Sequence, residues 1–231
     1  MIRGIVFDKD GTLFDFRASW GVWAQRFLAS LARDAAHARQ LADVIGYLPD
    51  SNGFTPDSPV IAATAADIAA VLLPHVSGYD LAGLTEAIDI AAAEVPMAEA
   101  VPLVALFTAL RDRGLKLGVA TNDSEVPARA HVQRHGLTEL LDFISGYDSG
   151  HGAKPGPGMC LAFASATGLD PAEVLMVGDS LHDLHAGRAA GMRPIAVLTG
   201  IAGEADLAPH AEVVLADIGA LPAWLDAQAR V

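Results

Sequence analysis

Two aspartates, Asp8 and Asp10, directly follow the short apolar run Ile5-Val6-Phe7 near the start of the chain. The run is rich in strand-forming residues, which predicts a buried strand that ends at the two carboxylates. Open α/β sheets bind ligands at the carboxyl ends of their strands. Carboxylates two residues apart can share a divalent cation, and Gly11 permits a tight turn that brings the hydroxyl of Thr12 to the same place. An Asp-Gly pair after a strand is also a common simple turn, so this segment alone leaves its function open.

Two further places in the sequence have side chains suited to binding phosphate. Thr121 and Asn122 follow a strand predicted at 115–120, and a helix is expected to start at Ser124. A hydroxyl and free backbone N–H groups at a helix start can bind an anion, although the same residues could simply cap the helix. Lys154 precedes a proline in a glycine-rich loop, where it could neutralise a phosphoryl oxygen and keep a nearby carboxylate ionised. An isolated loop lysine is more often a solvated surface charge.

A second pair of acids follows the strand predicted at 173–177. Asp179 comes at the end of that strand, and Asp183 lies four residues later, one turn up the next helix and on roughly the same face. This face is expected to point toward the end of the first strand. Acids at a helix start also stabilise the helix dipole, which is the structural alternative for Asp183.

From residue 98 onward, segments typical of helices alternate with segments typical of strands. This alternation predicts an α/β fold with a doubly wound parallel sheet and right-handed crossovers. The expected helices are 99–113, 125–135, 159–167 and 181–190, and the expected strands are 115–120, 143–144, 173–177, 194–198 and 213–215. The carboxyl ends of parallel strands share one edge, so we expect the polar residues described above to converge there.

Between the first strand and residue 98, only helical patterns are found, expected at 19–31, 35–45, 60–73 and 81–94, with Ser19 as the first cap. We therefore predict a small all-helical cap domain inserted after the first strand. Its predicted extent is 17–96, and residues 1–16 and 97–231 are predicted to form the α/β catalytic core.

The composition excludes several classes of partner. The formal net charge is −13 and the 15 lysines and arginines are scattered, which argues against a nucleic-acid or anionic membrane surface. The single cysteine, Cys160, excludes an internal disulfide. No apolar run approaches the ~18 residues of a membrane span and no leader pattern precedes the first strand, so we expect a cytoplasmic protein. The oligomeric state is open between a monomer and a homodimer.

The order of the motifs resembles the haloacid dehalogenase-like (HAD) superfamily of phosphohydrolases. The four motifs are Asp-x-Asp-Gly-Thr at the first strand, Thr-Asn after a later strand, Lys-Pro in a loop, and Gly-Asp-x-x-x-Asp. The resemblance covers essentially the full chain and implies the Rossmann-like core of that superfamily. Asp-Gly-Thr-Leu-Phe-Asp at 10–15 is most similar to phosphoglycolate phosphatase-like members, which carry a helical cap after the first motif.

The resemblance also implies roles for the acids. Asp8 would be the nucleophile that becomes an aspartyl-phosphate, and Asp10 would be the general acid and base. Mg²⁺ would be bound by Asp8, the backbone carbonyl of Asp10, Asp179 and Asp183. The reaction would be hydrolysis of a small phosphorylated metabolite, either phosphoglycolate-like or a sugar phosphate.

The same resemblance assigns the remaining polar residues of the motifs. Lys154 and Thr121 would be catalytic, cancelling charge on the phosphate and fixing its geometry. Thr12, Asn122 and Asp15 would contribute to binding the substrate or to orienting the site.

Some departures and alternatives narrow this interpretation. Asp10 argues against dehalogenase chemistry, and the lack of any lysine between Arg17 and Val101 argues against a phosphonatase with a cap lysine. Lys9 replaces the apolar residue that commonly separates the two aspartates, which leaves the identity of the substrate open. The roles of His182 and His185 are open as well. Two other functions stay open: a phosphomutase of the β-phosphoglucomutase type, and a non-catalytic module that senses a phosphorylated metabolite.

Overall fold

The central sheet has six parallel strands in the order β5-β4-β1-β6-β7-β8. The structure is a computed structural model that describes residues 1–228, so residues 229–231 of the predicted core lie outside the described part. The strands are β1 (Gly4–Phe7), β4 (Lys116–Ala120), β5 (Phe143–Ser145), β6 (Val174–Gly178), β7 (Arg193–Val197) and β8 (Val213–Leu215). The predicted doubly wound parallel sheet is confirmed.

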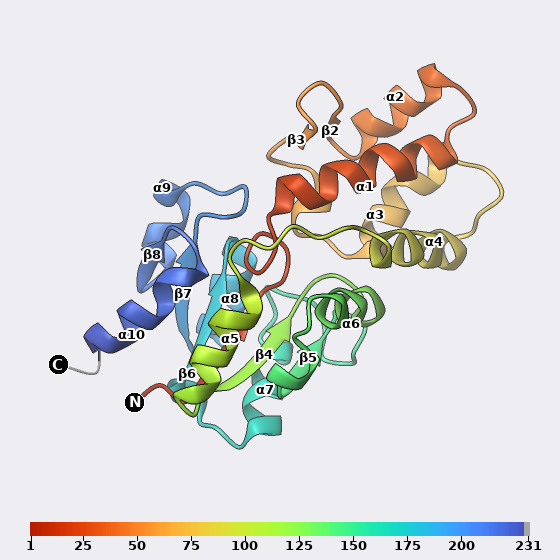
Figure 1. The fold of residues 1–231 in the computed structure, drawn as a ribbon. Helices are drawn as coiled ribbons and strands as arrows, with labels where there is room; N and C mark the ends of the chain where they lie inside the picture. Colours follow the sequence, from red (N-terminus) through yellow and green to blue (C-terminus); the bar gives the residue numbers. More distant parts are fainter. Residues whose placement is uncertain (229–231) are drawn as a thin grey trace.

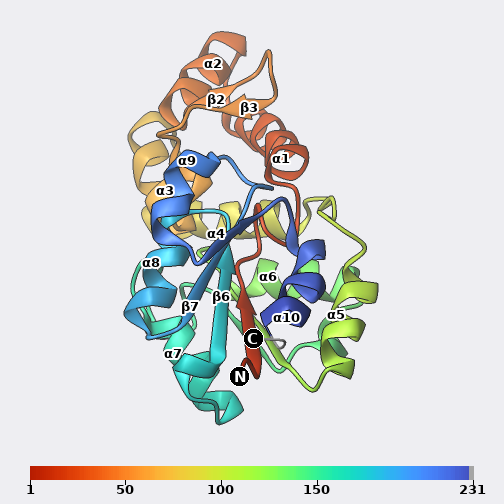
Figure 2. The same cartoon turned by 90° about the vertical axis from the view of Figure 1, so that its left-hand side faces the viewer.

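Helices cover both faces of this sheet (Figure 2). One face carries α5 (Leu103–Asp112), α6 (Glu125–Arg134) and α10 (Leu221–Gln228), and the other carries α7 (Gly158–Thr167) and α8 (Leu181–Ala189); the short α9 spans Glu204–Leu207. The central strand β1 is buried throughout, so its alternate side chains serve both faces. Phe7 contacts Phe107 of α5 with ring centroids 5.0 Å apart, whereas Val6 belongs to the cluster that includes Phe163 of α7.

The segment between β1 and α5 forms a separate layer beyond the carboxyl ends of the strands (Figure 1). It contains α1 (Phe16–Leu31), α2 (Ala35–Val44), α3 (Ala65–Leu72) and α4 (Leu81–Ala93). Its predicted helical character is borne out, but the structure adds a small antiparallel hairpin of β2 (Tyr47–Leu48) and β3 (Gly53–Phe54). The hairpin buries Tyr47 and Phe54 against each other and against Phe16, with ring centroids 5.5 and 5.6 Å apart. Strands of two residues lack the alternation that would have revealed them in the sequence.

The start of α1 differs from the prediction that Ser19 caps this helix. Asp15 is the cap, because its Oδ1 accepts a hydrogen bond from the backbone N–H of Ala18 at 2.8 Å. The hydroxyl of Ser19 instead donates to the backbone carbonyl of Asp15 at 2.7 Å, inside the first turn. The N–H of Asp15 donates to the carbonyl of Ala98 at 2.8 Å, so Asp15 also joins the two chain segments that connect the insert to the core.

Two other predicted helices are shorter than expected. The helix predicted at 99–113 begins at Leu103, directly after Pro102, and the one predicted at 60–73 divides into a 3₁₀ turn at Pro59–Ile61 and α3. For the other predicted helices and strands, the last residue lies within one position of the last residue observed in the structure. No helix within residues 1–228 is long and apolar enough to cross a membrane. The division into a core and a cap domain at residues 17–96 stays a prediction.

We predict that Phe107→Ala lowers the free energy of unfolding by about 3–5 kcal/mol, because it removes a fully buried ring that packs on Phe7. Urea denaturation followed by circular dichroism would measure this change. The control is Val104→Ala on the same helix, where the side chain is 47% exposed and the expected change is within about 0.5 kcal/mol. Equal effects of the two substitutions would contradict the assignment of α5 to the core.

Candidate active site

Three buried carboxylates meet at the carboxyl edge of the sheet. Asp8 follows β1, Asp179 follows β6, and Asp183 lies in the first turn of α8. The N–H of Asp8 continues the ladder by donating to the carbonyl of Val177 at 2.8 Å, which fixes Asp8 beside the end of β6. One oxygen from each carboxylate lies within 4.8 Å of the others. The predicted convergence of these acids is therefore present in the structure.

The ammonium group of Lys154 lies between two of these acids. Its Nζ donates to Oδ1 of Asp8 at 2.5 Å, to Oδ1 of Asp183 at 2.6 Å and to the backbone carbonyl of Ala120 at 2.8 Å. Burial alone would lower the pKa of Lys154, but Asp183 and Asp8 outweigh burial and raise it, so the side chain is a cation. The lysine therefore neutralises only part of the charge of the three carboxylates.

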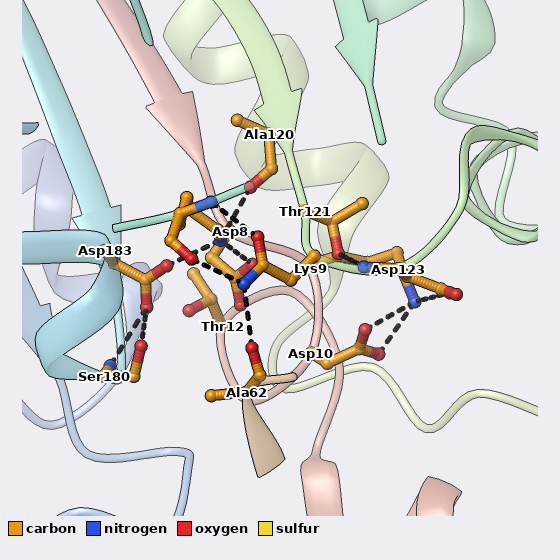
Figure 3. Close-up of polar contacts among 12 residues, drawn as sticks. Asp8, Lys9, Asp10, Thr12, Ala62, Ala120, Thr121, Asp123, Ser180 and Asp183 are labelled. Atoms are coloured by element: carbon orange, nitrogen blue, oxygen red, sulfur yellow. Dashed lines mark hydrogen bonds and ion pairs between the residues drawn. The ribbon is translucent and has the colours of Figure 1, made fainter. Parts of the chain in front are cut away.

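Asn122 holds the backbone of Lys154 in place. Its Oδ1 accepts from the N–H of Lys154 at 2.8 Å, and its Nδ2 donates to the carbonyl of Lys154 at 3.0 Å. The same Nδ2 donates to the carbonyl of Ala62 in the insert at 2.8 Å (Figure 3). The Lys154–Pro155 peptide bond is cis. Asn122 lines the cleft, and its amide is engaged by these backbone groups.

Burial and mutual repulsion raise the pKa of two of these acids, Asp8 and Asp179. The pKa of Asp8 is raised from 3.8 to about 7 by burial, with further increases from Asp183 and Asp10, while Lys154 acts in the opposite direction. Burial and the negative charges of Asp8 and Asp183 also raise the pKa of Asp179 well above its usual value. A divalent cation at this place would remove the repulsion, and carboxylate oxygens are the ligands that hard cations prefer. The three acids are thus a candidate metal site.

The turn after β1 brings the chain close to Asp179. Gly11 has φ +84°, and a Cβ at this position would lie 2.4 Å from Oδ2 of Asp179, so both the backbone conformation and the space require glycine. The hydroxyl of the fully buried Thr12 donates to Oδ1 of Asp179 at 3.2 Å. Thr12 therefore lies in the site, where its observed contact is with an acid of the metal-site candidate.

The carboxylate of Asp10 points away from Asp8 and Asp183 (Figure 3). Its Oδ2 lies 2.7 Å from Nζ of Lys9, and its Oδ1 accepts from Nε1 of Trp20 at 2.8 Å. Among the described residues, the metal-site candidate contains Asp8, Asp179 and Asp183 but not the side chain of Asp10. A metal contact of Asp10 would thus involve its backbone, as the predicted ligand set has it.

Lys9 is a member of the site that the sequence reasoning noticed only as a departure from a pattern. It is fully buried, and its Nζ contacts Asp10, Oδ2 of Asp123 at 3.1 Å and Nδ1 of His131 at 3.2 Å. Burial raises the pKa of Asp123 to about 6 against the effect of Lys9. Burial, aided by Lys9, lowers the pKa of His131 to about 3, so this imidazole is neutral. The charge of Lys9 is thus shared between two partly buried acids.

The other predicted residues differ in their distance from the chemistry. Thr121 lines the cleft, and its Oγ1 accepts from the N–H of Asp123 at 3.0 Å. Asp15 caps α1 and does not line the cleft. Ser180 was missed: its hydroxyl and N–H donate to Oδ2 of Asp183 at 2.6 and 3.0 Å and so orient that carboxylate. The position of Ser180 directly after Asp179, at a helix start, was the available signal.

The carboxylates face a cleft between the sheet edge and the insert. It is partly open to solvent. The sheet edge contributes the polar wall, which includes Asp8, Asp10, Thr121, Lys154 and His182, and the insert contributes the opposite wall. A buried carboxylate, an adjacent ammonium group and the candidate metal site thus open onto one cleft.

Comparison with known proteins places this geometry in a family. A family model of haloacid dehalogenase-like hydrolases matches residues 2–191. Among curated proteins, the chain is 35% identical to phosphoglycolate phosphatase of Rhodospirillum rubrum over 122 residues, which cover 53% of this chain and 51% of the relative. It is 27% identical to N-acetylmuramic acid 6-phosphate phosphatase of Pseudomonas aeruginosa over 90% of this chain and 87% of the relative. The match thus spans only about half the length of the Rhodospirillum protein and, likewise, of pyrophosphatase PpaX of Bacillus pumilus.

Solved structures share the fold at low sequence identity. CbbY from Rhodobacter sphaeroides, solved in complex with phosphate, has a TM-score of 0.70 at 22% identity and covers 96% of both chains. A HAD phosphatase from Thermococcus onnurineus has a TM-score of 0.69 at 21% identity, covering 97% of this chain and 98% of that one. The family model spans most of the sequence and includes all the acids that the fold brings to one edge of the sheet, and the chain therefore belongs to the haloacid dehalogenase-like hydrolases.

Proposed function

We propose that the chain is a Mg²⁺-dependent phosphatase that hydrolyses a small phosphate monoester through an aspartyl-phosphate on Asp8. The observation that carries the proposal is the buried cluster of Asp8, Asp179 and Asp183, bridged by Lys154 and opening onto the cleft. Membership of the family and the phosphatase names of the relatives support the same reaction.

The donor set of the cluster fits Mg²⁺. Asp8, Asp179 and Asp183 would hold the ion, together with the backbone carbonyl of Asp10. All three side chains are oxygen ligands, and a single lysine leaves them with excess negative charge. When bound, the ion supplies positive charge that lets an anionic nucleophile approach an anionic phosphate.

Asp8 and Asp10 would perform different tasks because their surroundings differ. An oxygen of Asp8 attacks phosphorus, and the bond between phosphorus and the leaving oxygen breaks as Asp10 donates a proton to that oxygen. Asp10 then takes a proton from the water that hydrolyses the acyl phosphate. The hydrogen bond from Trp20 and the contact with Lys9 keep the Asp10 carboxylate apart from the metal-site acids, in reach of the cleft.

The remaining predicted residues would support this step. Lys154 and the Thr121 hydroxyl would contact phosphoryl oxygens, and the contacts of Asn122 and Thr12 support roles in holding Lys154 and Asp179. Residues 17–96 would act as a cap that excludes water and restricts the substrate to small metabolites.

We predict that Asp8→Asn and Asp10→Asn each reduce phosphate release by at least about a thousandfold, measured with an ester that the wild-type protein hydrolyses. Asp8→Asn removes the nucleophile, and Asp10→Asn removes the proton donor. Steady-state release of inorganic phosphate measures both. Asp43→Asn, at an exposed position of α2, is the control and should retain full activity. Full activity of Asp8→Asn would refute the mechanism.

A wild-type protein that isomerises a sugar phosphate without phosphate release would be a mutase, and one that binds an ester without turnover would be a sensing module.

Metal removal should make the stability of the protein depend on pH. The raised pKa of Asp8 means that the metal-free folded state binds a proton more tightly than the unfolded chain. The stabilisation of the folded state by this bound proton is therefore complete at low pH and is lost as the pH rises from about 4 to about 7. In chelator, we expect Tm to fall between about pH 5 and about pH 7, and saturating Mg²⁺ to restore Tm and activity at the higher pH.

Differential scanning calorimetry at the two pH values, with chelator or Mg²⁺, tests this expectation. Asp8→Asn should show a smaller fall, since Asp8 no longer contributes and only the raised pKa values of other acids, such as Asp179 and Asp123, remain. A metal-free Tm that does not change across this range, or that Mg²⁺ does not raise, would contradict a cation site at these carboxylates.

Lys9→Met should destabilise the protein by about 3–5 kcal/mol, because the partly buried carboxylates of Asp10 and Asp123 would lose the fully buried cation between them. Urea denaturation measures this loss, and adding Asp123→Asn should recover part of it. The matched control is Lys116→Met, whose side chain is 46% exposed and pairs with Asp142, with an expected loss below about 1 kcal/mol. A loss in Lys9→Met no larger than in the control would show that Lys9 does not hold the two acids.

A further inference from the structure

We propose that the leaving group of the substrate is uncharged and mainly apolar, such as an alkyl or aryl alcohol. This inference rests on the proposed phosphatase function and concerns the part of the substrate that the insert contacts. It departs from the sequence-based expectation that the substrate is a phosphoglycolate-like compound or a sugar phosphate.

Every side chain that the insert contributes to the cleft is apolar apart from the indole N–H groups. The ten residues are two tryptophans, four branched aliphatic residues and four alanines, and the six largest are Trp20, Trp23, Val60, Ile61, Ile68 and Ile88. The two indole rings meet edge to face with centroids 5.4 Å apart. This wall lies across the cleft from the acids, so the group attached to the reacting phosphate must lie against it.

The apolar wall has no cation that could bind a second anionic group. The insert contains no lysine, and none of its four arginines (Arg17, Arg26, Arg33 and Arg39) lines the cleft. On the polar wall, Lys154 is bonded to Asp8 and Asp183. A carboxylate, as in phosphoglycolate, would therefore be desolvated against apolar side chains without a partner, which is strongly unfavourable.

Hydrogen-bond donors for a sugar are equally scarce on this wall. Nε1 of Trp20 is used by Asp10, whereas Nε1 of Trp23 is buried without a hydrogen-bond partner among the described residues. One indole N–H can satisfy a single neutral oxygen, but it cannot satisfy the several hydroxyls of a sugar, which would lose their water without replacement.

A series of phosphate monoesters tests the proposal with the wild-type enzyme and Mg²⁺. We expect kcat/KM to rise about fourfold for each methylene from ethyl to butyl phosphate. n-Propyl phosphate is matched in carbon number by 3-phosphooxypropanoate, for which kcat/KM should be lower by on the order of a hundredfold. Phosphoglycolate and glucose 6-phosphate should likewise be poor substrates.

The outcomes separate this inference from the proposed function. Phosphate release from phosphoglycolate or a sugar phosphate with kcat/KM equal to or above that of butyl phosphate would overturn the inference and leave the phosphatase assignment intact. No release from any ester would overturn both.

A substitution in the wall provides a second test. Ile61 is partly exposed in the cleft, and Ile61→Arg should raise kcat/KM for 3-phosphooxypropanoate and lower it for butyl phosphate, each by about tenfold. Ile90→Arg on α4 is the matched control, because Ile90 is 62% exposed and does not line the cleft, and both values should be unchanged. Equal responses of the two substrates to Ile61→Arg would show that the wall does not contact the leaving group.

Discussion

The repulsion among buried carboxylates at the end of β1 is the constraint on which the rest of the site depends. Asp8, Asp179 and Asp183 come from different elements, yet their oxygens lie within 4.8 Å of one another. Such a cluster is stable only with positive charge inside it. Lys154 supplies part of that charge through two short contacts, and Asn122 fixes its backbone from both sides. The remaining negative charge favours a cation at this place, so the repulsion within the metal-free cluster and the proposed metal site have one origin.

A second buried lysine separates the acids into two groups. The chain has only three lysines, and Lys9 and Lys154 are both buried at this site. Lys9 pairs with Asp10 and Asp123, whereas Lys154 pairs with Asp8 and Asp183. Asp8 and Lys9 are adjacent in the chain but belong to different networks of ion pairs. Asp8 and Asp10 therefore have different surroundings. Different surroundings are what a nucleophile and a general acid require of two chemically identical side chains.

The sequence predicted the parts of the site that follow from strand periodicity and sheet topology. Apolar runs that end in Asp8, Thr121 and Asp179 identified strand ends, and parallel pairing necessarily brings those ends to one edge. The direction of each side chain was not accessible in this way. The contacts of Lys9 depend on Asp123 and on a histidine 122 residues away in sequence, and the hairpin at Tyr47–Phe54 is too short to show periodicity. Both features are set by tertiary packing.

The insert affects the chemistry as well as the choice of leaving group. Most of its contribution to the cleft is an apolar wall, and the charged groups belong to the core. Two of the hydrogen bonds between the insert and the core end at residues of the cleft: Trp20 of α1 donates to Asp10, and Asn122, which holds the backbone of Lys154, donates to the carbonyl of Ala62. A displacement of the insert would break both bonds. The surroundings of Asp10 and of Asn122 therefore depend on the insert lying against the core, so in the proposed mechanism the exclusion of water would be coupled to the assembly of the reacting groups.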